Sequence, residues 1–108
     1  MTLRLHLVEG VLHIEGEVDG ASAQETRDRL LAAAPAAPTP LDLLDLDLDD
    51  GVAVVEMVNA VRALRDRWGH AELRHAPQML AHTLYKVGDL RSRITLVAPR
   101  EDEGTTAN

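Results

Sequence analysis

Cysteine is absent from this 108-residue chain, phenylalanine is also absent, and there is only one tyrosine and one tryptophan. Without cysteine the chain can form neither disulfides nor thiolate metal sites. Because 45% of the residues are hydrophobic although so few are aromatic, the core has to consist of Leu, Val and Ala, which suits helices packed on a sheet. The length fits one domain with a single core.

The sequence also lacks a long apolar run, a signal peptide and an excess of basic residues. No segment is apolar over the length needed to span a bilayer, and the opening MTLRLHLVEG has no charged segment followed by an apolar one. The formal net charge of −7 argues against a nucleic-acid partner, which needs a concentrated basic face. We expect a soluble, acidic, cytoplasmic domain that inserts into no membrane.

Two short segments of alternating hydrophobicity, 3–8 and 11–15, flank the turn Glu9-Gly10 and predict a β-hairpin. We expect their apolar side chains to face the core: Leu3, Leu5, Leu7, Leu12 and Ile14. A helix follows to about Ala34, with Ser22 or Asp19 as its N-cap. Three prolines then end this helix: Pro35, Pro38 and Pro40.

The stretch 41–68 changes its period halfway, at Gly51. Residues up to 49 alternate with period two, which predicts a strand with leucines on the buried face and aspartates outside: Leu44, Leu46 and Leu48 against Asp45, Asp47 and Asp49. After Gly51 the apolar residues recur every three or four positions, which predicts an amphipathic helix: Val54, Met57, Val58, Val61, Leu64 and Trp68. Gly69 ends this helix.

The remaining segments continue the alternation of strands and helices. Residues 70–76 predict a strand, Pro77 begins a helix that Gly88 ends, and 93–98 predict a last strand. Ala71, Leu73, Leu80, Leu84 and Val87 are expected to face inward. The order β-β-α-β-α-β-α-β predicts an α/β fold with a mixed sheet and helices packed mainly on one face. The domain spans 1–99, and 100–108 form a disordered acidic tail.

The outward strand positions carry charges of both signs, which predicts cross-strand pairing on an open sheet face. These positions are Arg4, His6, His13, Glu15, Asp45, Asp47, Glu72 and Arg74.

Three stretches carry a family resemblance: GVLHIEGEVDGASAQETRDRLLAA, LDLLDLDLDDGVAVVEMVNAVRALRDRWG and HAELRHAPQMLAHTLYKVGDL. Their order and pattern resemble the STAS domain of bacterial anti-sigma-factor antagonists and of the cytoplasmic ends of sulfate transporters. The resemblance covers residues 3 to about 98. In phospho-regulated members, the loop before the central helix carries Asp-Ser-Ser-Gly or Asp-Thr-Ser-Gly, which a partner kinase phosphorylates. Here the loop reads Asp49-Asp50-Gly51-Val52-Ala53, so no hydroxyl is present there to accept a phosphate.

The acids around this loop have several interpretations. Asp45, Asp47, Asp49 and Glu56 match four ligand positions of an EF-hand loop, but Gly51 comes one residue late and no helix enters the loop. We therefore favour a one-sided strand over a calcium site. Capping of the central helix accounts for Asp49 and Asp50, and we favour it over mimicry of a phosphate.

No pattern of catalytic or metal-binding residues is present. The five histidines form no H-x-x-x-H or H-E-x-x-H pair, although His6 and His13 could be neighbours on the hairpin. The glycines are scattered singly, and neither Ser22 nor Ser92 lies in a nucleophile-elbow context. We expect no enzymatic activity, no metal and no cofactor.

These observations and the resemblance predict a non-enzymatic interaction and signalling domain without a phosphorylation switch. It docks a protein partner through the loop, the central helix and the following helix. The expected contact residues are Asp49, Asp50, Gly51, Val52, Glu56, Asn59, Arg62, Met79, His82 and Tyr85. By resemblance the partner is an anti-sigma factor or kinase-like ATPase. The alternative is a cytoplasmic STAS subunit bound to the ATPase of an ABC-type lipid transporter. The sequence is also compatible with a homodimer.

Overall fold

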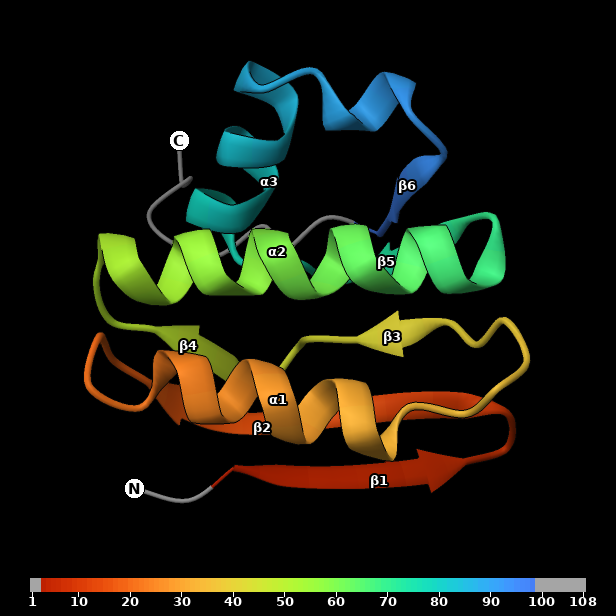
Figure 1. Ribbon diagram of the computed structural model, residues 1–108, viewed down its shortest axis with the longest axis horizontal. Coiled ribbons are helices and arrows are strands. Elements are labelled where there is room, and N and C mark those ends of the chain that lie inside the picture. Colours follow the sequence, from red (N-terminus) through yellow and green to blue (C-terminus); the bar gives the residue numbers. More distant parts are fainter. Residues whose placement is uncertain (1–2, 99–108) are drawn as a thin grey trace.

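A computed structural model describes residues 3–98, which form a six-stranded mixed sheet and three α-helices (Figure 1). The elements are β1 (Arg4–Val8), β2 (Val11–Val18), α1 (Ala23–Ala33), β3 (Leu41–Asp42), β4 (Leu46–Leu48), α2 (Gly51–Trp68), β5 (Ala71–Arg74), α3 (Gln78–Lys86), the 3-10 helix η1 (Asp89–Arg91) and β6 (Ile94–Val97). The predicted α/β class is confirmed, and the element order matches the prediction except that the central strand is divided in two. The predicted tail 100–108 lies outside the described residues.

The sheet has the order β1-β2-β3-β5-β6, and β4 pairs with β2 beyond the end of β3. Only β1 is antiparallel to its neighbour; β2, β3, β4, β5 and β6 run parallel. Each of the three crossovers moves toward β6, and right-handed crossovers in one direction place their helices on one face. The inward strand residues are accordingly buried, and the opposite face is polar.

The hairpin turns at Glu9 and Gly10, which have φ angles of 52° and 80°. Two positive φ angles in a two-residue loop define a type I′ turn, and its twist matches the strands. Leu3 and Leu12 are buried as predicted, but Leu7 is 59% exposed. Leu7 pairs with Leu12 and so faces the helix side. Its prediction as a core residue was wrong because β1 is the edge strand and no helix covers its end.

The predicted central strand is split into β3 and β4 by a one-residue bulge. Leu12 pairs with Leu41 and Gly16 with Leu46, so β2 advances four residues while its partner advances five. The extra residue is accommodated by a turn in which Leu46 N–H donates to Leu43 O at 3.1 Å. Leu43 is therefore buried and Leu44 is 51% exposed, so the predicted inward position of Leu44 was wrong.

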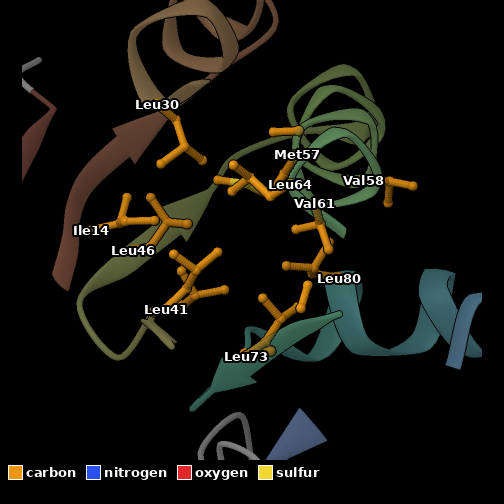
Figure 2. Packing of buried hydrophobic residues seen from close by; sticks show 14 of the residues in the cluster. Ile14, Leu30, Leu41, Leu46, Met57, Val58, Val61, Leu64, Leu73 and Leu80 are labelled. Carbon is orange, nitrogen blue, oxygen red and sulfur yellow. The ribbon is translucent and has the colours of Figure 1, made fainter. Parts of the chain in front are cut away.

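The core lies between the sheet and the three helices. All six apolar residues predicted for the buried face of α2 are at most 9% exposed: Val54, Met57, Val58, Val61, Leu64 and Trp68. Figure 2 shows Leu30, Leu64 and Leu80, one from each helix, pointing toward the space where Leu41 and Leu46 of the sheet lie. Burial of this many aliphatic side chains is the main stabilising contribution.

The ends of the helices follow the sequence signals. Gly69 ends α2 with φ 84°, and Gly88 follows α3 with φ 81°. At the start of α1, Asp19 Oδ1 accepts from Ser22 N–H at 2.9 Å; hydrogen bonds from the Ser22 backbone and hydroxyl lower the pKa of the Asp19 carboxyl. Val87 is 50% exposed. Its predicted place in the core was wrong because α3 ends at Lys86, before another buried position is reached.

The open face of the sheet carries the predicted polar pairs. Arg4 contacts Glu15 at 3.0 Å. Asp42, on the central strand β3, lies 3.5 Å from His13 Nδ1 and 3.2 Å from His75 Nδ1. Partial burial opposes ionisation of Asp42, but hydrogen bonds from Leu44 N–H and His75, and the charges of both histidines, outweigh it and lower the pKa of this carboxyl.

Candidate protein-interaction surface

The junction between β4 and α2 is fixed by the carboxylate of Asp50. Its Oδ1 accepts from Ala53 N–H at 2.9 Å and so caps α2, while its Oδ2 accepts from Gly20 N–H at 2.8 Å. Both oxygens are thus used for backbone groups, one in the helix and one in the loop after β2. Capping accounts for Asp50, as the sequence predicted. The same carboxylate also ties together two loops that are thirty positions apart.

Asp49 has a different role from its neighbour. Its backbone N–H donates to Val18 O at 2.8 Å and so extends the pairing of β4 with β2. Its side chain is exposed, and no hydrogen bond or ion pair joins the carboxylate to any residue in 3–98. Asp49 therefore does not cap α2, so the capping role predicted for it was wrong, and its carboxylate is exposed at the start of the helix.

The first two turns of α2 expose apolar side chains to solvent. Val52 is 54% exposed and Val55 is 53% exposed. Asn59 continues the same outward row at a spacing of four residues and is also exposed. Gly51 is exposed and begins the helix. The start of α2 therefore offers an outward apolar surface beside the free carboxylate of Asp49.

Two further predicted contact residues on α2 are engaged by neighbouring elements. Glu56 accepts from Arg27 of α1 at 2.7 Å, so it lies on the α1 side of α2. Arg62 donates to Asp89 of η1 at 2.6 Å, which places it on the opposite side. Asp89 is 6% exposed, so the Arg62 pair holds η1 against α2. The sequence predicted one shared exposed side for Glu56 and Arg62, and the structure separates them.

An open groove of about 830 Å³ lies between the end of β4 and the start of α3. Its lining residues are Asp47, Leu48, Asp49, Pro77, Gln78, Met79 and His82. The groove forms because β4 and β5 are parallel, so their carboxyl ends reach the same edge of the sheet, where ligand sites of open α/β sheets lie. In Figure 1 the end of β4 and the starts of α2 and α3 lie on the same side of the molecule.

The groove brings together three of the predicted contact residues: Asp49, Met79 and His82. Met79 is 58% exposed, so it lies at the surface and not in the core. Tyr85 is 71% exposed and lies three residues beyond His82 on α3. It borders a separate shallow depression with Lys86 and Arg91.

No docking role was predicted for four of the lining residues: Asp47, Leu48, Pro77 and Gln78. Asp47 was weighed as a calcium ligand and then assigned, like Leu48, to a strand, and Pro77 was predicted only as a helix start. A signal was nevertheless present, because residues that directly follow parallel strands meet at one edge of the sheet.

Within residues 3–98, no group of three or more His, Asp or Glu side chains is arranged to hold a metal ion. The predicted neighbours His6 and His13 do pair across the hairpin. Over the same residues, no helix is both long and apolar enough to cross a bilayer.

Comparison with known proteins adds no relative: no protein-family model matches the chain, and no curated protein matches it.

Proposed function

We propose that this chain is a non-enzymatic protein-interaction domain of the STAS type, in which no phosphorylation switch operates at the β4–α2 loop. It docks a protein partner through the start of α2 and the adjoining groove. The observation that supports this proposal is the exposure of Val52 and Val55 at the start of α2 and of Met79 in the groove, each more than half exposed. Large apolar side chains gathered in one exposed area mark interaction sites.

The chemistry of the groove favours docking over catalysis. Its lining contains no hydroxyl or thiol, so His82 has no nucleophile beside it to activate. Methionine is an adaptable contact residue that packs against differently shaped partners. A flexible Met79 in the groove, together with two rigid valines at the start of α2, is therefore suited to a protein-binding surface.

The charges around the apolar side chains define the complementary partner surface. Asp49 carries a free carboxylate, Asp47 lies beside it in the groove, and Glu17 is exposed at the end of β2, paired with Asp47. Negative charge at the rim attracts positive charge on the partner and increases the association rate. The partner surface accordingly has an apolar centre and a basic rim. The ATPase partners implied by the STAS resemblance, an anti-sigma-factor kinase or a transporter ATPase, are the two candidates.

The test is capture of the partner from native cell extract with the immobilised chain, followed by identification and measurement of affinity. We expect Val55→Asp to weaken binding of the captured protein at least about tenfold, the effect of an interface residue worth more than 1.4 kcal/mol. Val8→Asp is the matched control, because Val8 is 50% exposed but lies in β1. It should bind like the unmodified chain.

The identity of the captured protein separates the two candidate partners. A kinase-like ATPase of the sigma-factor pathway supports the signalling function, and the ATPase of a lipid transporter supports the alternative. Equal binding by Val55→Asp and Val8→Asp would show that the start of α2 is not the docking surface.

A further inference from the structure

The outer edge of β1 is the best-defined unpaired feature outside the proposed docking surface. β1 pairs with β2 on one side, and no strand among residues 3–98 pairs with its other side. An edge strand presents backbone N–H and C=O groups that can pair with another strand.

The register of the hairpin determines which backbone groups face outward. In an antiparallel pair, the residues alternate between hydrogen-bonded and non-hydrogen-bonded positions. Leu12 pairs with Leu7 in register, but Leu12 N–H donates to Pro40 O at 2.9 Å, away from β1. Leu7 is therefore at a non-hydrogen-bonded position, and so is Leu5, two residues earlier. The N–H and C=O groups of Leu5 and Leu7 point to the open edge.

The side chains of β1 are distributed in a way that suits self-pairing. Leu5 and Leu7 lie on the helix side of the sheet, where Leu7 is 59% exposed. Arg4 and His6 lie on the polar face. Natural edge strands are protected by proline, lysine, bulges or inward charges, and the segment 4–8 has none of these.

We propose that β1 pairs antiparallel with β1 of a second copy of the chain, around a two-fold axis that passes between the two His6 residues. In this register Leu5 of each copy lies opposite Leu7 of the other, and both pairs are hydrogen-bonded positions. Four main-chain hydrogen bonds form, and each exposed Leu7 is covered by a Leu5 side chain. The two sheets join into one continuous sheet.

The other edge of the sheet is less suitable for a second copy. β6 has four residues, and it is bounded by Arg93 and Ala98, which have positive φ angles of 70° and 50°. Backbone in that region leaves the extended conformation, so β6 offers a shorter straight edge than β1. A five-residue edge gives a small interface, and we expect a weak, concentration-dependent dimer.

The absence of cysteine allows a direct test by disulfide formation. In the proposed register, the two His6 residues form a non-hydrogen-bonded pair with Cα atoms ~4.5 Å apart, within the range that a disulfide bridges. His6→Cys should therefore form a covalent dimer rapidly under mild oxidation. Arg4→Cys is the matched control on the same face: its two copies would lie ~14 Å apart, so it should cross-link much more slowly.

Sedimentation velocity over a series of protein concentrations provides the second measurement. The unmodified chain should show a monomer–dimer equilibrium, and Leu7→Pro should shift it strongly toward monomer. Leu7 N–H points outward, so proline removes a dimer hydrogen bond but none from the hairpin. Leu7→Lys should have the same effect if the proline variant folds poorly. The proposal is overturned if the unmodified chain stays monomeric throughout, or if Arg4→Cys cross-links as fast as His6→Cys.

Discussion

Replacement of Asp50 by alanine should destabilise the fold more than any other substitution in the β4–α2 loop. The change removes two hydrogen bonds at once, one from Ala53 N–H at the start of α2 and one from Gly20 N–H in the loop after β2. Loss of a carboxylate N-cap costs about 1 kcal/mol. The bond to Gly20 is solvent-exposed and contributes about 1 kcal/mol more. We therefore expect the free energy of unfolding to fall by about 2 kcal/mol.

Asp50→Asn separates the two contributions. Asparagine is as good an N-cap as aspartate, but its amide has only one acceptor oxygen and cannot accept from both Ala53 and Gly20. This variant should lose about half as much stability as Asp50→Ala. Asp49→Ala is the matched control, because Asp49 is exposed and adjacent in sequence. Its effect should stay within about 0.5 kcal/mol.

The assay is urea denaturation followed by far-ultraviolet circular dichroism at neutral pH, with the melting temperature as a second measurement. A loss of about 2 kcal/mol corresponds to a decrease of about 10 °C in Tm for a domain of this size. If Asp50→Ala and Asp49→Ala were equally stable, the assignment of Asp50 as the link between the two loops would be wrong.

Two other predictions test the core and the open sheet face. Met57→Asp should unfold the domain, because Met57 is 4% exposed and an unpaired charge there costs about 4 kcal/mol or more. Val55→Asp, two residues earlier on the exposed side, is the control and should keep the native circular dichroism spectrum. A native-like spectrum for Met57→Asp would contradict the assignment of the buried face. Asp42 has a lowered pKa in the folded chain, so its contribution to stability is present above the unfolded pKa of about 3.9 and is lost as pH falls through the folded pKa. Unfolding free energies of Asp42→Asn should therefore decrease less than those of the unmodified chain in this acidic range, and parallel pH profiles would refute the pairing of Asp42 with His13 and His75.

Local periodicity was sufficient to predict most of the fold. The hairpin, the three helices and the element order follow from patterns confined to a few residues, such as the three- and four-residue spacing from Val54 to Trp68. The failures concern long-range packing. Leu7 and Val87 have apolar side chains in apolar patterns, but whether a neighbouring element covers them depends on the lengths of α1 and α3 and on the position of β1 at the edge. The prediction for Leu44 was wrong because the bulge is defined by the pairing with β2, which the local sequence pattern does not show.

The candidate site was predicted in part. Helical spacing placed Glu56, Asn59 and Arg62 on one polar side of α2, and that spacing could not show that Arg27 and Asp89, distant in sequence, engage Glu56 and Arg62. Asp49 follows β4, and Met79 lies in the helix that follows β5. The two residues meet in the groove because β4 and β5 run parallel, so that both strands end at the same edge of the sheet. Topology therefore determines this surface, and helix periodicity alone identifies only its individual members.

The bulge between β3 and β4 keeps the leucines on both sides of it in the core. Leu43, Leu44 and Asp45 span a distance that two residues cover on β2. If the strand ran straight with all three residues in place, every side chain after them would move to the other face. Asp47 would then replace Leu46 or Leu48 in the core, although no residue had changed its type. The bulge absorbs the extra residue, so that Leu46 lies on the same buried face as Leu41 and Leu43.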